Sequence, residues 1–288
     1  MPQSPEVRAL LHAPTSTFSY VAWDPATREA VIVDPVLDYD GPSGRTGTAS
    51  AAALLAVVER EGLALRWILE THAHADHLSA AGFLHQRTGA PVGIGAGITA
   101  VQATFGEIYH LGPEFATDGR QFDRLFSDGD RVALGELEIE VLATPGHTSD
   151  SVTYLLGDAA FVGDTLFAPD YGSARCDFPG GDPATLFRSV RRLYALPPTT
   201  RLFLCHDYPP DGRAPRCEWS VAEQRAGNLH IRQETEESEF VAMRRARDAG
   251  LNMPALIIPA VQVNIRAGRL PEPEANGRRY LRIPLDTL

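Results

Sequence analysis

Residues 71–77 read THAHADH, and this stretch places three histidines and one aspartate within seven positions. An extended backbone puts alternate side chains on one face, so His72 and His74 can approach one ion together. A turn into a following helix would then bring Asp76 and His77 to the adjoining side. An isolated histidine is more often an ordinary surface or core residue, but this spacing is typical of a metal site. The motif therefore predicts a metal centre at the end of a strand.

Composition places the chain among ordinary globular proteins. Of its 288 residues, 44% are hydrophobic and 22% are charged. The formal net charge of −11 argues against a nucleic-acid-binding surface, which would require a basic patch. Pro254 and Pro259 interrupt the longest apolar run, and the N-terminus lacks the layout of a signal peptide. We therefore expect no nucleic-acid partner, no membrane partner and a cytoplasmic location.

Strand and helix patterns alternate along the chain, which is typical of an α/β fold. The apolar runs predict strands at 29–36, 66–70 and 201–205, and hairpins over 130–147 and 153–164 that turn at Gly135 and at Gly157–Asp158. Helices are predicted at 48–62, 77–89, 182–196 with Asp182 as its cap, and about 234–248. We expect a single domain over residues 1–288, with a helical and extended C-terminal portion from about residue 215.

The three cysteines, Cys176, Cys205 and Cys217, show no paired spacing. Neither a disulfide framework nor a zinc knuckle is therefore indicated, and reduced thiols are favoured. Cys176 and Cys205 lie near candidate site segments in the sequence, so both are candidates to line a pocket.

Three further segments offer ligands directly after apolar runs. TPGHT places His147 after a proline and a glycine, FVGDT places Asp164 after a glycine, and LCHDY places His206 at the end of a predicted strand. Glycine-flanked polar residues are ordinary features of loops, so each segment alone is a weak signal. Together they repeat one arrangement of strand, turn and ligand, which supports a shared metal site.

The order of THAHADH, TPGHT, GDT and CHDY resembles the metallo-β-lactamase superfamily. The resemblance implies an α/β fold, an αββα sandwich of two mixed sheets flanked by helices, with the metal site at one edge. In dinuclear members each ion has three ligands of its own, and an aspartate bridges the two ions. The positions matching the first ion are His72, His74 and His147, those matching the second are Asp76, His77 and His206, and the bridge is Asp164.

Longer segments resemble the persulfide dioxygenase branch, in particular the bacterial β-lactamase-hydrolase-like persulfide dioxygenases. The likeness extends over residues 168–183, 205–210, 218–228 and 261–285. It implies one Fe(II) per chain, or zinc in its place, held by the residues matching His72, His147 and Asp164. Two histidines and a carboxylate match the facial triad of non-haem iron oxygenases, which leaves open positions for substrate and O2.

The activity implied is oxidation of glutathione persulfide, or a similar small persulfide, to sulfite and thiol, a step of sulfide detoxification. His74, Asp76, His77 and His206 would then orient the site or contact bound water, and Asp76 and His206 are the candidate catalytic residues. Arg175 and Tyr208 match positions that the family uses near the glutathione pocket. Alternatively, Arg175 forms a structural salt bridge with Asp177, and Tyr208 only packs.

Structural roles are expected for several other polar residues. Asp207 either orients His206 or caps a turn, and Asp34 in IVDPV is expected to have a structural role in a turn. The remaining histidines without ligand spacing are His12, His85, His110 and His230.

Two rival functions stay open. A dinuclear zinc hydrolase of a glutathione thioester, as in glyoxalase II, or of a lactone would use a bridging hydroxide, with Asp76 handling protons. TPGHTSDS lacks the glycine of the TPGHTxGS form common among such hydrolases, which weighs against a thioesterase. The other rival is a catalytically idle metal-binding protein. By analogy with the family, a homodimer is expected.

Overall fold

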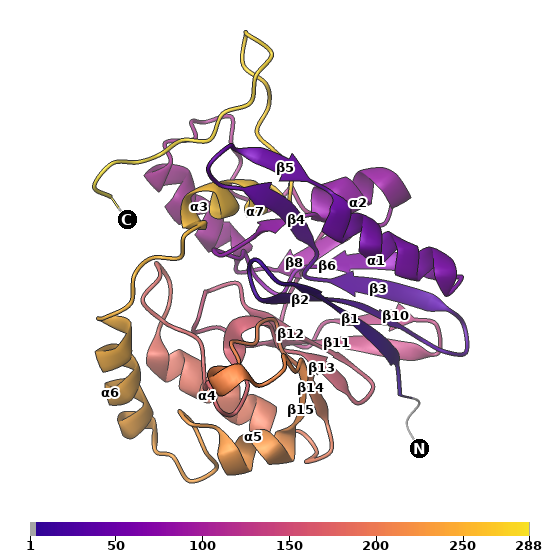
Figure 1. Cartoon of the computed structure of the whole chain (residues 1–288), viewed down its shortest axis with the longest axis vertical. Coiled ribbons are helices and arrows are strands. Elements are labelled where there is room, and N and C mark those ends of the chain that lie inside the picture. The colour runs from indigo at the N-terminus through magenta and orange to yellow at the C-terminus, as the bar shows by residue number, and fades with distance from the viewer. Residues whose placement is uncertain (1–3, 288) are drawn as a thin grey trace.

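Two six-stranded sheets pack face to face between two layers of helices (Figure 1). This computed structural model describes residues 4–287. The first sheet has the order β1 (Glu6–His12), β2 (Thr17–Trp23), β3 (Glu29–Val33), β6 (Ala64–Leu69), β8 (Val92–Gly95), β9 (Arg124–Phe126). The second has the order β10 (Arg131–Leu134), β11 (Leu137–Ala143), β12 (Val152–Leu156), β13 (Ala159–Phe161), β14 (Arg201–Phe203), β15 (Glu218–Ser220). A small third sheet joins β5 (Arg45–Gly47), β4 (Val36–Asp40) and β7 (Leu78–Ser79).

Both large sheets mix parallel and antiparallel pairs. In the first sheet the pairs from β3 to β9 are parallel, and in the second only the pair of β13 with β14 is parallel. The helices of the first outer layer are α1 (Ala49–Arg60), α2 (Ala81–Thr88), α3 (Ile98–Ile108) and α7 (Ile257–Asn264). Those of the second are α4 (Pro183–Tyr194), α5 (Val221–Gly227) and α6 (Glu237–Asp248).

Three apolar layers hold this stack together. Leu54 of α1 packs with Ile32 on the outer face of the first sheet, Tyr20 packs with Tyr154 between the sheets, and Leu186 of α4 belongs to the cluster beneath the second sheet. Alternate residues of one strand therefore serve different layers, since Ile32 faces the helices and its neighbours face the other sheet. This arrangement confirms the predicted sandwich of mixed sheets flanked by helices.

Most predicted elements are present with small shifts at their ends. The strands at 29–36 and 66–70 appear as β3 and β6, both hairpins turn at the predicted glycines, and the helices at 48–62 and 182–196 appear as α1 and α4. Asp182 caps α4, because its carboxylate accepts hydrogen bonds from the Thr185 backbone N–H and hydroxyl, each at 2.7 Å. The strand at 201–205 ends earlier, at Phe203, and α6 begins at Glu237.

The helix predicted over 77–89 is wrong at its start. Leu78 and Ser79 instead form β7, which pairs with β4, and the helix begins only at Ala81. The physical reason is a distant clamp, Asn264 at the end of α7. Its side-chain amide donates to the backbone oxygens of His74 (2.7 Å) and His77 (2.8 Å), and its oxygen accepts from Ser79 N–H (2.8 Å). These bonds hold the segment in an extended form.

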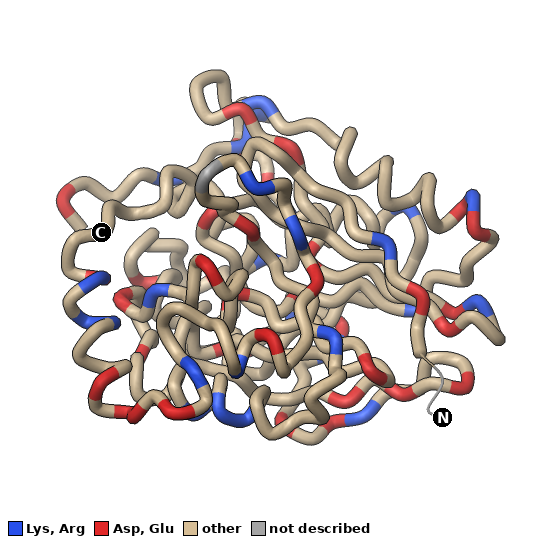
Figure 2. The backbone as a smooth tube through the Cα atoms, turned by 60° about the horizontal axis from the view of Figure 1, so that its bottom comes forward, with Lys and Arg blue, Asp and Glu red and all other residues tan. Residues whose placement is uncertain are grey.

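Charged residues of both signs are interspersed along the backbone in the view of Figure 2. Several form ion pairs across loops, such as Arg213 with Asp170 at 2.8 Å and Arg201 with Asp158 at 2.8 Å. Within residues 4–287, none of the helices has the length and apolar character needed to cross a membrane.

Candidate metal centre

The predicted ligands meet at one edge of the stacked sheets because each follows the end of a central strand. The THAHADH segment leaves β6, His147 follows β11, Asp164 lies in a single 3-10 turn (Gly163–Thr165) after β13, and His206 follows β14. The sheets face each other, so these four chain segments converge on one place. The sequence repeats the order of strand, turn and ligand four times, and the fold places all four ligand segments around one site.

Two glycines let the ligand loops approach their neighbours closely. Gly146 has a φ of 134°, and a Cβ there would lie 2.3 Å from the Leu186 backbone nitrogen. Gly163 has a φ of 52°, and a Cβ there would lie 2.6 Å from Thr71 Oγ1. Both backbone conformations are unfavourable for residues with a side chain. Each glycine directly precedes a candidate ligand, His147 or Asp164, and so fixes where that side chain points.

His72, His147 and Asp164 form a compact buried group. Their ligand atoms all lie within 4.8 Å of one another. Asp164 Oδ2 is 3.9 Å from His72 Nε2 and 3.7 Å from His147 Nε2. These separations are too long for hydrogen bonds but suit three donors that surround one cation. The structure thus brings together the three residues predicted as primary ligands.

The outer nitrogen of each imidazole in this group is already engaged. His147 Nδ1 lies 2.8 Å from the Arg175 backbone oxygen, and His72 Nδ1 lies 3.1 Å from Thr71 Oγ1. Within the described chain, His72 Nε2 and Asp164 Oδ1 are buried without a hydrogen-bond partner. Metal-binding histidines typically donate through one nitrogen to the protein and coordinate through the other. The donor set therefore fits a bound metal ion.

His74 does not join this group. Its Nε2 lies 3.1 Å from Asp34 Oδ1 and 3.5 Å from Glu70 Oε2. Asp34 also accepts hydrogen bonds from the Thr71 backbone N–H (2.7 Å) and hydroxyl (2.9 Å). The sequence predicts only a structural role in a turn for Asp34. Its buried carboxylate also orients His74 of the THAHADH motif. A strand-end aspartate was the only sequence signal for that contact.

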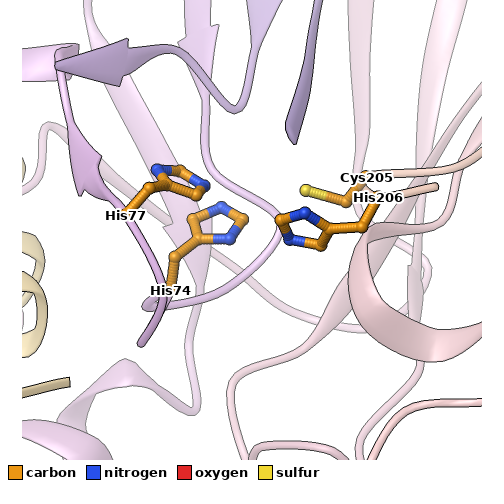
Figure 3. A group of neighbouring side chains, drawn as sticks. All are labelled: His74, His77, Cys205 and His206. Atoms are coloured by element: carbon orange, nitrogen blue, oxygen red, sulfur yellow. The ribbon is translucent and has the colours of Figure 1, made fainter. Parts of the chain in front are cut away.

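Asp76 and His206, the candidate catalytic residues, lie together on the other side of Asp164. His206 Nε2 is 3.1 Å from Asp76 Oδ2 and 3.4 Å from Asp164 Oδ1. Burial opposes the charged imidazole, but the two carboxylates outweigh it and raise the pKa of His206 well above 6.5. For His77, burial and the neighbouring His74 lower the pKa to about 3. Its ligand atom groups with His74, Cys205 and His206 (Figure 3), not with Asp76.

A cavity of about 400 Å³ opens onto the metal-ligand group. Its wall includes Asp76, His147 and Asp164, together with both predicted substrate-binding residues, Arg175 and Tyr208. His230, Arg244 and Arg247 also line the cavity, and the Arg244 guanidinium pairs with Asp248 at 2.7 Å. The same cavity wall therefore carries arginines and two residues of the ligand group.

Arg175 forms the structural salt bridge with Asp177 that the sequence offered as one alternative. Its guanidinium pairs with Asp177 at 2.5 and 2.6 Å, donates to the Asn252 backbone oxygen at 2.7 Å, and lies over the Phe178 ring at 4.8 Å. It nevertheless lines the cavity, and its backbone oxygen holds His147. These contacts fix the guanidinium in one orientation.

Tyr208 packs against aromatic neighbours at the cavity wall. Its ring lies 4.9 Å from that of Tyr171 and stacks on His206 at 5.7 Å. Burial, reinforced by Asp76 and Asp164, raises the pKa of Tyr208, so the phenol stays protonated and can donate a hydrogen bond. Packing and a polar contact with substrate are therefore compatible.

Three other residues have roles that the structure defines. Asp207 does not contact His206 by a hydrogen bond; its carboxylate binds Arg213 at 2.8 Å and the Arg216 backbone N–H at 2.6 Å, and so holds the loop after β14. The three cysteines are free thiols. Cys176 belongs to the core beneath the second sheet, and Cys205 is buried beside His74, His77 and His206.

The sequence predicts an ordinary role for His230, but the residue lines the cavity. Its Nδ1 accepts the Ser173 backbone N–H at 2.9 Å, while its Nε2 is buried with no hydrogen-bond partner among the residues described. No motif surrounds it, so its position depends on tertiary contacts that local sequence does not reveal.

The free energy of unfolding is expected to fall as the pH drops from 6.5 to about 4, partly through His230. Burial, with Arg244 and Arg247 nearby, lowers the pKa of His230 from 6.5 to about 4. Between these pH values the unfolded chain binds a proton there that the folded protein does not. The variant His230→Asn keeps an acceptor for Ser173 and should show a shallower fall in urea titrations of metal-free protein. Equal slopes would contradict this assignment, because the other buried histidines titrate in both proteins.

Comparison with known proteins places this geometry in context. The sequence profile described as "Metallo-beta-lactamase superfamily" matches residues 12–206, which include every ligand named above. The chain is 55% identical over 284 residues to a probable metallo-hydrolase of Burkholderia pseudomallei (strain 1710b), a match that covers 95% of this chain and 97% of that protein. It is 54% identical to a beta-lactamase hydrolase-like protein of Agrobacterium fabrum and covers 65% of that protein's length, less than two thirds.

Similarity to ETHE1 proteins is lower but extends over most of the chain. Identity to the human mitochondrial persulfide dioxygenase ETHE1 is 31% over 265 residues, 91% of this chain and 88% of that protein. The crystal structure of ETHE1 from Myxococcus xanthus superimposes with a TM-score of 0.72 at 34% identity, over 92% of this chain and 100% of that chain.

Proposed function

Because the chain belongs to the metallo-β-lactamase superfamily, we propose that it is a non-haem Fe(II) sulfur dioxygenase that oxidises glutathione persulfide or a similar small persulfide. The observation that supports this most is the grouping of His72, His147 and Asp164 while His74 is held by Asp34. Two imidazoles and one carboxylate form the ligand set of iron oxygenases that keep positions open for substrate and oxygen. The similarity to ETHE1 proteins points the same way.

The reaction proposed converts glutathione persulfide, O2 and water into glutathione and sulfite, with release of protons. Fe(II), held by His72, His147 and Asp164, supplies the unpaired electrons that let triplet oxygen react with a closed-shell sulfur compound. Asp76 lines the cavity with its Oδ2 3.1 Å from His206 Nε2, so the Asp76 carboxylate is placed to take up the proton of the persulfide. The protonated Tyr208 hydroxyl is a hydrogen-bond donor at the same wall.

The arginines Arg175 and Arg247 on the cavity wall suit a substrate that carries carboxylates, as glutathione does. Replacing Arg175 with alanine is expected to raise the KM for glutathione persulfide about tenfold or more, because a hydrogen bond to a charged group contributes roughly 1.5–3 kcal/mol. Steady-state oxygen uptake measures the effect. The exposed Arg188 on α4, which pairs with Glu237 at 3.4 Å, offers a matched control as Arg188→Ala. An unchanged KM in Arg175→Ala would remove this residue from the substrate site.

Oxygen consumption tests the proposed function directly. Protein reconstituted with Fe(II) should consume O2 when glutathione persulfide is supplied and should form sulfite in equal amount. Without persulfide, or with glutathione alone, uptake should stay at the background rate. Failure to consume oxygen under these conditions would refute the proposal.

A dinuclear zinc hydrolase is the second candidate, favoured by one observation. Asp76, Asp164 and His206 form a further group of ligand atoms within 4.8 Å, adjacent to the first group through the shared Asp164. The similarity to a probable metallo-hydrolase agrees with that reading. Hydrolysis of S-lactoylglutathione by the two-zinc protein, with no response to persulfide, would identify this function. The homodimer, the cytoplasmic location and the lack of nucleic-acid or membrane partners stay predictions from the sequence.

A further inference from the structure

The His230 imidazole on the cavity wall has one ring nitrogen bound by the protein and one without a partner. Nδ1 accepts the Ser173 backbone N–H at 2.9 Å, and a guanidinium nitrogen of Arg244 lies 3.4 Å from the same atom. Both of these groups can only donate, so Nδ1 is the acceptor and the proton of the neutral ring is on Nε2. His230 is 9% exposed, and its Nε2 is buried with no hydrogen-bond partner in the described chain. The ring therefore holds an unused N–H donor beside the cavity.

The neighbours of His230 fix the position of its ring. Gly172 has a φ of 112°, and a Cβ there would lie 2.2 Å from His230 Nδ1. The segment that leads to Ser173 thus packs directly on the Nδ1 edge of the ring. Arg244 is 2% exposed, and its guanidinium donates to Asp248 at 2.7 and 2.9 Å and to the Ser173 backbone oxygen at 3.1 Å. Because the Nδ1 edge is covered, Nε2–H is the polar group that this ring can offer to a molecule in the cavity.

Arg247 supplies a positive charge near this donor. Three arginines line the cavity, and the guanidinium groups of Arg175 and Arg244 are bound by Asp177 and Asp248. Within residues 4–287, the guanidinium of Arg247 has no ion pair and no hydrogen bond. Arg247 lies close enough to His230 to contribute to the lowering of its pKa. The wall thus combines an unpaired cation with a neutral N–H donor.

We propose that Arg247 and the Nε2–H of His230 form a carboxylate subsite, which binds the glycine carboxylate of glutathione. An arginine fork together with a further N–H donor can satisfy both oxygens of a carboxylate. The other carboxylate of glutathione stands beside an ammonium group, which the arginines of this wall would repel. This inference rests on the proposed function and names the part of the substrate that the cavity selects. A persulfide whose carrier lacks a carboxylate, such as cysteamine, is therefore expected to be a poor substrate.

S-Methylglutathione tests the carboxylate subsite by binding alone, because this thioether is not a persulfide and does not turn over. Its affinity for the Fe(II)-loaded protein can be measured by calorimetry in the absence of oxygen. Esterifying its glycine carboxylate removes the charge that the subsite is proposed to bind. For the wild-type protein, we expect the ethyl ester to bind about tenfold more weakly than the acid.

Arg247→Ala completes a thermodynamic cycle with the two ligands. The variant should bind the acid about tenfold more weakly than the wild-type protein does, and it should bind the ester with unchanged affinity. Arg247 is exposed and has no bonded partner for its guanidinium, so the variant is expected to fold. Equal losses for acid and ester would overturn the proposal, as would an unchanged affinity for the acid.

His230→Asn tests the second member of the subsite. Asparagine keeps an acceptor for the Ser173 N–H but has no group in place of Nε2–H, so the acid should bind about fivefold more weakly and the ester should be unaffected. The matched control is Arg245→Ala, which removes an exposed arginine of the same helix, α6, that does not line the cavity. A loss of acid binding in Arg245→Ala as large as that in Arg247→Ala would show a general effect of charge and reject the subsite.

Binding and turnover separate this inference from the proposed function. Binding that depends on the glycine carboxylate, in a protein without persulfide-dependent oxygen uptake, would reject the dioxygenase and keep the subsite. Oxygen uptake with the same KM for the persulfides of glutathione and of its glycine ethyl ester would keep the dioxygenase and reject the subsite.

Discussion

Replacing Asp164 with alanine is expected to abolish both iron retention and persulfide oxidation. Asp164 supplies the only carboxylate of the proposed triad, and its Oδ2 faces His72 Nε2 at 3.9 Å and His147 Nε2 at 3.7 Å. Two neutral imidazoles alone cannot balance the charge of a divalent ion in a buried site, and a methyl group offers no ligand. Iron content after desalting and oxygen uptake with glutathione persulfide measure the two losses.

Asp182→Ala is the matched control for Asp164→Ala. It removes another aspartate that follows a loop, but Asp182 caps α4 and belongs to none of the ligand groups. The control should lose about 1 kcal/mol of stability and keep its iron. Circular dichroism of both variants separates loss of ligand from loss of fold. Full iron content and activity in Asp164→Ala would show that the ligand assignment is wrong.

Asp34→Ala is expected to destabilise the protein by about 3–5 kcal/mol, the usual cost of removing one partner of a buried ion pair. Asp34 accepts from the Thr71 backbone N–H (2.7 Å) and hydroxyl (2.9 Å), and it faces His74 Nε2 at 3.1 Å. Burial opposes its charge, but His74 and the Thr71 donors outweigh burial and keep the pKa of Asp34 below 3.8. Its φ of 49° adds strain for alanine. Urea unfolding of the metal-free protein measures the loss.

Asp34→Asn separates charge from backbone strain. Asparagine tolerates a positive φ and keeps an acceptor for the Thr71 N–H, so the charge facing His74 and the acceptor for the Thr71 hydroxyl are lost without added backbone strain. We expect a smaller destabilisation, about 1–3 kcal/mol, together with a 10–100-fold weaker affinity for metal at sites that use the THAHADH histidines. Stability of Asp34→Ala within about 0.5 kcal/mol of the wild-type protein would mean that this carboxylate does not hold the motif.

The grouping of the candidate ligands and most of the fold could be predicted from the sequence because their signals are local. His147 and Asp164 each follow an apolar run and a glycine, and the glycines prove to be required by close backbone contacts. The strands and the cap at Asp182 depend on residues a few positions apart. When several strands end in such turns at one edge of a sheet, their ligands lie close together.

The remaining features depend on partners that are distant in the sequence. The contact of His74 with Asp34 spans 40 residues, and Ser173 contacts His230 across 57. The mistaken helix start at residue 77 has the same origin, since Asn264 lies 185 residues beyond Ser79. Local periodicity favoured a helix, but the tertiary hydrogen bonds outweighed it. Such contacts follow from the packing of the whole sandwich, which no local pattern encodes.

The clamp formed by Asn264 also sets an order of events during synthesis. On the ribosome, the THAHADH residues emerge nearly 200 residues before α7, while the backbone oxygens of His74 and His77 still lack the amide that later binds them. We therefore expect this loop to take its final form only after α7 has docked, and a nascent chain arrested before residue 264 would lack the clamp on His74 and His77.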